Sequence, residues 1–440
     1  MHIAILGRQP ALGLAELERV FGGKSIKPLS SQAAIIETDT IDIRRLGGTL
    51  KSGEVIAELP QGDWHRVSQK IVQYYCEAWS SSEGKITLGI SAYGFPVDSR
   101  EVQKTGIILK QKLKKLGTSL RLVPNPEPAL STAISHHNKL GLSANKVELI
   151  VVRASGGKVF IAESTGSQNI TAYAKRDQMR PKRDAFVGML PPKLAQIMIN
   201  FAVNQVADGS RSKTVDVESA PLLEGDVPGR ASRAPQDDQG SPVERPPKGN
   251  GADSTEQKSN LRILDPFCGT GVILQEAALM GYSVYGTDLA EKMIRYSRDN
   301  LNWLAESHHV TFDWYLHEGD AMKTKWQQPI DAVVGETYLG QPFSAPPSPS
   351  KLAEVRKNCD YIITEFLKNL SSQIEPGTPV CVAVPAWRDK EGHFTHLPLI
   401  ATIARLGFKP HEFSNVSQND LLYYRENQVV ARELLVLTKV

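Results

Sequence analysis

Residues 208–260 constrain the architecture of this chain more than any other part of its sequence. The stretch is rich in proline, glycine, serine and charged residues, and it contains no aromatic residue. Such a composition cannot bury enough apolar surface to offset the entropy lost on ordering, so we predict a disordered insertion. A compact domain does not accommodate a structureless loop of this length. The 440 residues should therefore fold as globular halves on either side of the insertion.

The C-terminal half, residues 261–440, alternates between short apolar runs and helical segments. A strand at 261–264 precedes a glycine-containing loop and a helix at 272–280. Further strands are expected at 283–287, 310–316, 330–334, 380–384 and 434–437, and further helices at 290–305 and 351–370. This alternation predicts an α/β fold with a doubly wound, Rossmann-like sheet.

The N-terminal half has a mixed α+β pattern. We expect strands at 2–6 and 85–91, a hairpin of 149–152 with 159–163, and helices at 11–21, 64–79, 104–116 and from Pro192 onward. The helix at 104–116 is predicted to be amphipathic. Its inward face should comprise Ile107, Ile108, Leu113 and Leu116, and its outward face should carry lysines.

Composition excludes several classes of protein. Hydrophobic residues make up 41% of the chain and charged residues 22%, which is typical of a globular protein. No apolar run approaches the roughly 18 residues of a membrane span. The four cysteines form no C-x-x-C pair, so neither a disulfide scaffold nor a cysteine-rich zinc site is expected. The histidine pairs also lack the spacing of metal ligands, so we expect no metal. The scattered cysteines favour a reducing, cytoplasmic location.

Positive charge is concentrated in one region although the net charge is only +3. Residues 101–200 contain sixteen Lys or Arg against six Asp or Glu. This excess favours contact with a polyanion such as nucleic acid, and a solvated lysine-rich face is the alternative. A cluster predicted to contact RNA phosphates, or else to form a solvated linker, comprises Lys175, Arg176, Arg180, Lys182 and Arg183.

A loop between the first strand and helix of the C-terminal half carries the clearest functional signal. It reads DPFCGTG at 265–271, and glycines there let backbone N–H groups approach a ligand closely. The next strand ends in Asp288, which can bridge ribose hydroxyls, and the third ends before Asp320, which can reach an adenine amine. The predicted cofactor-binding residues are Asp265, Phe267, Gly269, Gly271, Asp288, Asp320 and Ala321.

The loop favours S-adenosylmethionine over a dinucleotide. Leu274 stands where a dinucleotide site would have a third glycine or an alanine, and the acidic Asp265 would repel a pyrophosphate. S-adenosylmethionine has no phosphate and carries a cationic ammonium and sulfonium, which suit a carboxylate. A phosphate-gripping lysine, as in a P-loop, is also absent from this loop.

Several stretches together resemble a known family. DPFCGTG at 265–271 with GTD at 286–288 is similar to class I RNA methyltransferases that carry an N-terminal THUMP domain. LGRQP at 6–10, YAKRD at 173–177 and RELLVL at 432–437 resemble the tRNA guanine-N2 methyltransferases that act at the tenth nucleotide. The resemblance extends over essentially the whole chain except the predicted insertion.

This resemblance implies a domain organisation and partners. The implied regions are a ferredoxin-like domain (1–60), a THUMP RNA-binding domain (61–165), an interdomain segment and helix (166–207), the disordered insertion (208–260) and a Rossmann-like methyltransferase domain (261–440). The implied substrate is tRNA, which the THUMP domain would grip by its acceptor end. A monomer is expected, and a small activating partner protein is left open.

The catalytic motif departs from the family pattern of Asp-Pro-Pro-Tyr. This chain reads Glu336-Thr337-Tyr338-Leu339 instead. The resemblance implies that Glu336 accepts hydrogens of the guanine amine and that Tyr338 stacks on the base. Because proline restricts the backbone, its loss should loosen the loop. The alternatives are a different target atom and an RNA-binding relative without turnover.

Overall fold

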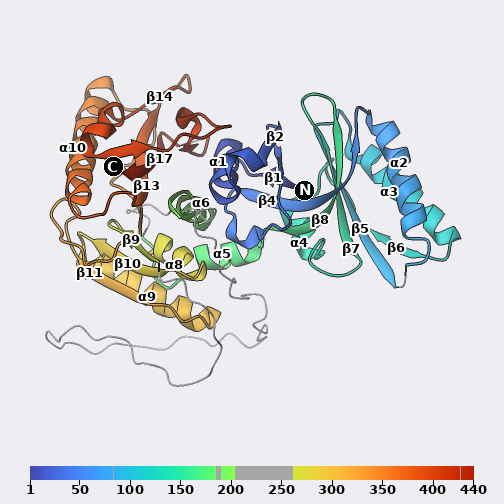
Figure 1. Ribbon diagram of the computed structural model, residues 1–440, viewed down its shortest axis with the longest axis horizontal. Coiled ribbons are helices and arrows are strands. Elements are labelled where there is room, and N and C mark those ends of the chain that lie inside the picture. The colour runs from blue at the N-terminus through green and yellow to red at the C-terminus, as the bar shows by residue number, and fades with distance from the viewer. Residues whose placement is uncertain (83, 185–189, 204–260, 427) are drawn as a thin grey trace.

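The computed structural model describes residues 1–82, 84–184, 190–203, 261–426 and 428–440. The insertion predicted at 208–260 lies outside these residues. The described chain forms two lobes, each built on one β-sheet (Figure 1). We call residues up to 184 the N-terminal lobe, and residues 190–203 together with those from 261 onward the C-terminal lobe.

The N-terminal lobe contains a single eight-stranded sheet in the order β2-β3-β1-β4-β8-β7-β5-β6. The strands are β1 His2–Leu6, β2 Ile26–Ser30, β3 Ala33–Ile36, β4 Thr49–Leu59, β5 Lys85–Tyr93, β6 Ser119–Leu122, β7 Lys146–Arg153 and β8 Val159–Ser167. The predicted hairpin is confirmed, since β7 and β8 are antiparallel. β4 pairs with both β1 and β8, so the regions expected as separate domains, 1–60 and 61–165, share one continuous sheet.

The helices of this lobe are α1 Pro10–Phe21, α2 Trp64–Ala78, α3 Ser99–Lys115, α4 Thr132–His137 and α5 Ile170–Gln178. α2 and α3 lie side by side at the end of the molecule remote from the C-terminal lobe (Figure 1). α3 begins five residues earlier than predicted because Asp98 caps it, accepting a 2.9 Å hydrogen bond from the Glu101 amide.

The predicted inward face of α3 was partly wrong. The buried stripe passes through Val102, Leu109 and Leu113, whereas Ile107 is 43% and Leu116 is 53% exposed. The helical period that places Val102 and Leu109 against the sheet puts Ile107 off the buried stripe. Leu116 lies beyond the last helical residue, where it caps the helix.

The C-terminal lobe contains the predicted α/β sheet, in the order β11-β10-β9-β12-β13-β17-β15. Its strands are β9 Arg262–Asp265, β10 Ser283–Asp288, β11 Trp314–Glu318, β12 Ala332–Glu336, β13 Pro379–Arg388, β14 Phe394–Thr395, β15 Phe408–Pro410, β16 Leu422–Tyr423 and β17 Val430–Lys439. Strands β9 to β13 are parallel, and β17 is antiparallel to β13. The strand order reverses between β9 and β12, which is the switch point where open α/β sheets bind ligands.

One predicted strand in this sheet started too early. The apolar run at 310–316 was expected to be a strand, but β11 begins only at Trp314. The amide of Val310 instead donates to the carbonyl of Ala305, a bond that closes the turn after the preceding helix. Only the second half of the run is therefore in the strand.

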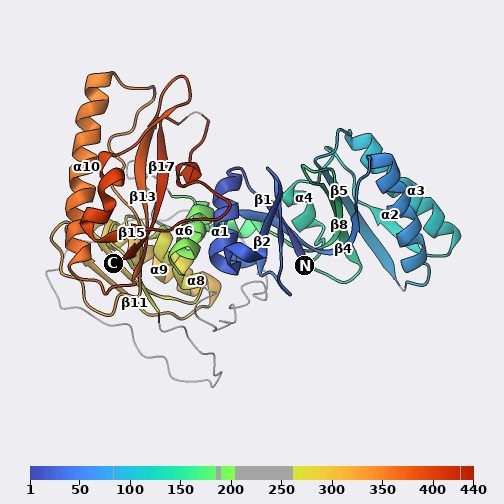
Figure 2. The same ribbon diagram turned by 45° about the horizontal axis from the view of Figure 1, so that its top comes forward.

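Helices cover both faces of the C-terminal sheet (Figures 1 and 2). One core contains side chains from α6 Pro192–Ala202, α8 Val272–Leu279 and α9 Glu291–His308. The other contains those of α10 Pro349–Ser371 and the 3-10 segment η3 Pro398–Leu406. The helix expected in an interdomain segment, α6, is thus part of the C-terminal lobe, although it precedes residue 208. Within the described chain, no helix is long and apolar enough to cross a membrane.

Buried polar contacts join the two lobes. Glu16 of α1 accepts a 2.7 Å hydrogen bond from the Asn200 side chain of α6. Glu18 accepts two bonds of 2.7 Å from the backbone amides of residues 414 and 415. Arg19 donates a 2.9 Å bond to the carbonyl oxygen of Phe201. These contacts fix α1 against the C-terminal lobe.

Candidate active site

The glycine-containing loop lies between β9 and α8, at the switch point of the sheet. Gly271, with φ of 79°, adopts the left-handed conformation that favours glycine, and a Cβ there would lie 2.9 Å from the Ser297 hydroxyl. The Ser297 hydroxyl also donates a 2.9 Å hydrogen bond to the carbonyl of Gly269. Asn300 donates a 2.8 Å bond to the Thr270 carbonyl. Two side chains of α9 therefore hold the loop in place.

Asp265 and Asp288 meet at this loop. Asp265 is 2% exposed, and one of its oxygens accepts a 3.1 Å hydrogen bond from the Phe267 amide. Asp288 accepts 2.9 Å bonds from the amides of Gly269 and Ala290. Burial raises the pKa of Asp265 well above its usual value, and the charges of Asp288 and Glu336 add to that effect. Burial also raises the pKa of Asp288.

The third predicted strand end adjoins the same place. The amide of Gly319 donates a 2.9 Å hydrogen bond to the backbone carbonyl of Asp288, so the turn that carries Asp320 and Ala321 lies beside β10. Asp320 accepts a 3.0 Å bond from the Met322 amide, and Ala321 is buried. The structure thus gathers the predicted cofactor-binding residues at one edge of the sheet.

The residues at this edge fit S-adenosylmethionine. A cationic ammonium and sulfonium complement the carboxylates of Asp265 and Asp288, and the loop at 265–271 offers no Lys or Arg to hold a phosphate. Asp288, at the end of β10, stands where a carboxylate can accept hydrogen bonds from ribose hydroxyls. Phe267 is partly buried and packs edge-on against Phe366 of α10, with ring centroids 4.9 Å apart.

Glu336 is the last residue of β12, and its charge is close enough to contribute to the raised pKa of Asp265. The backbone of the preceding Gly335 adjoins Asp265, since a Cβ on this glycine would lie 3.2 Å from an Asp265 oxygen. The Glu336 carboxylate accepts a hydrogen bond from the Nε of Arg432, a residue of β17. Our sequence reasoning did not foresee this partner. Arg432 stands 96 residues away, and although RELLVL at 432–437 contributed to the family resemblance, no local pattern assigned its arginine a role.

The loop after Glu336 is held by Thr337 rather than by proline. The amide and the hydroxyl of Thr337 donate bonds of 3.0 and 2.9 Å to the same carbonyl, that of Ala383 in β13. The expected loosening of this loop is therefore countered at its first residue. Tyr338 follows with 43% of its surface exposed, so its ring is accessible at the carboxyl end of the sheet.

Two members of the predicted RNA-contacting cluster are buried. Arg176 forms a bidentate ion pair with Glu276 of α8, with N–O distances of 2.7 and 3.1 Å, and it packs over the Tyr173 ring. Arg180 is 3% exposed, and its nearest acidic partner, Asp177, is 3.9 Å away. Contact with an RNA phosphate needs an accessible guanidinium. Because Arg176 and Arg180 are buried, the structure does not support the prediction that they bind RNA.

The other three members of the cluster are accessible. Lys175 and Arg183 are exposed, and Lys182 is partly exposed with its ammonium 3.5 Å from Asp299. The backbone amide and carbonyl of Lys182 also bond to the Asn300 side chain, which itself holds the glycine loop. The accessible cations therefore lie on a segment attached directly to the candidate cofactor site.

Comparison with known proteins agrees with this geometry. Residues 257–409 match a family described as a methyltransferase domain. A tRNA (guanine(10)-N2)-dimethyltransferase of Methanothermobacter thermautotrophicus is 33% identical over 134 residues, which make up 30% of this chain and 36% of that protein. The protein of the same name from Pyrococcus abyssi is 36% identical over 97 residues, 22% of this chain and 26% of that protein.

The chain therefore matches about a third of the length of the first of these relatives and about a quarter of the second. Among solved structures, TrmN from Thermus thermophilus aligns over 100% of this chain and 99% of its own, with 16% identity and a TM-score of 0.48. Residues 257–409 of the C-terminal lobe thus match a methyltransferase domain, and parts of the chain are similar in sequence to tRNA (guanine(10)-N2)-dimethyltransferases.

Proposed function

We propose that this protein transfers a methyl group from S-adenosylmethionine to the exocyclic N2 of a guanosine in tRNA. The observation that carries the proposal is the position of the Glu336 carboxylate. Glu336 ends β12 at the edge of the sheet where Asp265 ends β9, its charge acts on Asp265, and the accessible Tyr338 follows two residues further on. An acceptor and an aromatic ring thus stand next to the candidate cofactor site.

The chemistry requires activation of a weak nucleophile. The lone pair of an exocyclic guanine amine is delocalised into the ring, and an acceptor that binds the amine hydrogens localises it. When bound, S-adenosylmethionine would supply an electrophilic methyl group on a positively charged sulfur, which retains the bonding electrons as the methyl leaves. Glu336 would orient the amine and take up the proton released as the new N–C bond forms. Tyr338 would stack on the base.

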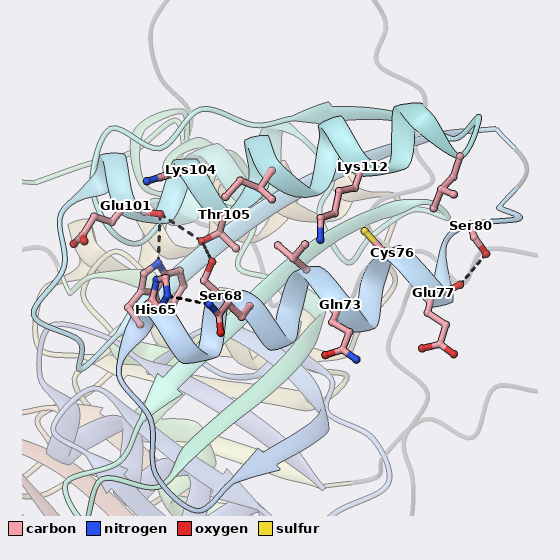
Figure 3. A pocket seen from close by; sticks show the side chains of 15 residues that line it. His65, Ser68, Gln73, Cys76, Glu77, Ser80, Glu101, Lys104, Thr105 and Lys112 are labelled. Atoms are coloured by element: carbon pink, nitrogen blue, oxygen red, sulfur yellow. Dashed lines mark hydrogen bonds between the residues drawn. The ribbon is translucent and has the colours of Figure 1, made fainter.

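The N-terminal lobe is proposed to bind the RNA. α3 carries six Lys or Arg residues and one acidic residue, and it borders a groove of about 910 Å³ shared with α2 (Figure 3). Lys104 and Lys112 line this groove, with the apolar Val72 and Ile108 between the helices. Lysines that line a groove can contact the phosphates of an RNA backbone, whose charge dominates such binding. The groove therefore supports an RNA-gripping role for the region expected to be a THUMP domain, 61–165.

The accessible cations beside the glycine loop extend this proposed RNA surface to the catalytic lobe. Lys175, Lys182 and Arg183 would contact phosphates close to the target nucleotide. We further propose that the region 1–60 is a ferredoxin-like part of the N-terminal lobe that contacts the C-terminal lobe through α1, and that the protein acts as a monomer in the cytoplasm.

The proposal is tested by incubating the purified protein with methyl-labelled S-adenosylmethionine and an unmodified tRNA transcript. Label should enter the RNA as N2-methylated guanosine, identified by nucleoside mass spectrometry. Glu336→Gln should reduce transfer by about 100-fold or more, since it removes the carboxylate that orients the amine. Binding of cofactor and tRNA without transfer by the unmodified protein would contradict the proposal and leave an RNA-binding role. Methylation at another atom would contradict the target.

A further inference from the structure

Glu336 has one side-chain partner among the described residues, and that partner is Arg432. The two residues come from strands that do not touch each other, because β13 lies between β12 and β17. In the register of the sheet, Glu336 is opposite Ala383, and Arg432 is opposite Pro385. Arg432 therefore reaches across β13, past the small side chain of Ala383, to meet the carboxylate.

The pair is largely shielded from solvent. The side chains of Arg432 and Glu336 are 9% and 14% exposed, respectively. An ion pair at this depth is screened much less than a surface pair. The bond engages Oε1 of Glu336, and in the described part of the chain no group donates a hydrogen bond to Oε2. The carboxylate is thus held at one oxygen and available at the other.

The electrostatic setting favours a cation at this point. Three carboxylates, those of Asp265, Asp288 and Glu336, gather at the carboxyl ends of neighbouring strands. Their charges oppose one another, and the effect on the buried Asp265 is described above. Like charges at short range disfavour ionisation, and an adjacent guanidinium offsets that repulsion. Arg432 supplies this positive charge from β17, which in the strand order lies on the opposite flank of β12 from β9.

We propose that Arg432 is a positioning residue that orients the Glu336 carboxylate, holding Oε1 and presenting Oε2 to the target amine. This inference rests on the proposed function and goes beyond it, because it assigns the aiming of the acceptor to β17 instead of to the motif loop. A proline-rich motif would stiffen the acceptor through its own backbone. Here the hydrogen bonds of Thr337 hold the backbone and Arg432 holds the side chain.

The neighbouring residue provides a matched control. Glu433 follows Arg432 in β17, is equally buried, and pairs with His396 at 2.7 Å. Successive residues of a strand point to opposite faces of the sheet, so Glu433 faces away from Glu336. Glu433→Gln thus removes a buried carboxylate and its contact with His396 from the same strand without touching the acceptor.

The test measures single-turnover methyl transfer to tRNA together with separate dissociation constants for S-adenosylmethionine and tRNA. Arg432→Gln should lower the transfer rate constant by roughly 10- to 100-fold, since misplacement by about 1 Å costs about 100-fold. Both dissociation constants should stay within about threefold of the original values. Arg432→Lys retains the charge with a single donor group and should restore part of the rate.

A double variant distinguishes positioning from general damage. Because Arg432 acts through Glu336, Arg432→Gln should add little to the loss caused by Glu336→Gln, whereas independent effects would multiply. Multiplying losses would overturn the inference, and so would a rate for Arg432→Gln equal to that of Glu433→Gln. If Arg432→Gln does not fold, Arg432→Lys alone tests the inference. An unchanged transfer rate constant together with weakened cofactor binding in Arg432→Lys would then overturn it. Absence of transfer by the unmodified protein would contradict the proposed function itself.

Discussion

Arg176→Met should destabilise the C-terminal lobe far more than removal of an exposed cation. Arg176 links α5 to Glu276 of α8 through two hydrogen bonds, and Glu276 is 1% exposed. Loss of the guanidinium leaves this carboxylate buried without a partner. Breaking a buried pair in this way typically costs about 3–5 kcal/mol. Methionine fills a similar volume, so the lost charge dominates the effect.

Lys182→Met is the matched control, since it removes a pair of 3.5 Å between half-exposed side chains. An exposed pair contributes about 0–1 kcal/mol. Urea unfolding followed by circular dichroism at about pH 7.5 gives both differences. Arg176→Met combined with Glu276→Leu should recover most of the lost stability, because apolar replacement of both partners removes the unpaired charge.

The deficit of the single variant should also depend on pH. Burial raises the pKa of Glu276, and Arg176 counteracts that rise. Without Arg176 the folded protein retains the proton to a higher pH, so the variant should lose less stability at about pH 5 than at about pH 7.5. A single variant no less stable than Lys182→Met, or a double variant as unstable as the single one, would refute this reasoning.

Three further predictions concern the lobe interface and the cofactor site. Burial raises the pKa of Glu16 from 4.5 to about 7. Protonation of Glu16 therefore stabilises the folded state fully below about pH 4.5. This contribution, on the order of 3 kcal/mol, is lost as the pH rises to about 7. Glu16→Gln should remove that part of the pH dependence of urea unfolding. Gly47→Ala would place a Cβ 2.0 Å from the carbonyl oxygen of Lys193 and should cost about 1–3 kcal/mol or more in the same assay, whereas Gly156→Ala, with no atom within 4 Å, should be neutral. Asp288→Ala should weaken S-adenosylmethionine binding about 10- to 100-fold by calorimetry, as expected for loss of a charged hydrogen-bond acceptor, and unchanged affinity would contradict its assigned role.

Features that depend on neighbouring residues in the chain were predictable. The strand–loop–helix pattern around 261–280 placed the glycine loop correctly, and the acids at the ends of successive strands led to one sheet edge. Parallel strands bring their carboxyl ends together whatever their length, so spacing along the chain was sufficient. The hairpin of β7 and β8 was likewise predicted from two short apolar runs that lie close together in the chain.

Burial of charged residues was not predictable from local sequence. YAKRD at 173–177 has the composition of a basic linker, yet Arg176 and Arg180 are buried. The acid that pairs with Arg176 stands 100 residues later, in α8. The local sequence of a basic cluster does not show whether each cation contacts solvent, RNA or a buried carboxylate. The role of each residue depends on its partner, which can lie far away in the chain.

The amino-acid sequence by itself determined the α/β class of the C-terminal lobe, the glycine loop and the three carboxylates at one edge. These features arise from periodicity and from the geometry of parallel strands, which act over a few residues at a time. Only the tertiary structure decided that α6 completes the C-terminal core, that one sheet runs through the whole N-terminal lobe, and that Arg432 meets Glu336. Those arrangements depend on side chains brought together from distant parts of the chain, where packing and the pairing of buried charges select the partner.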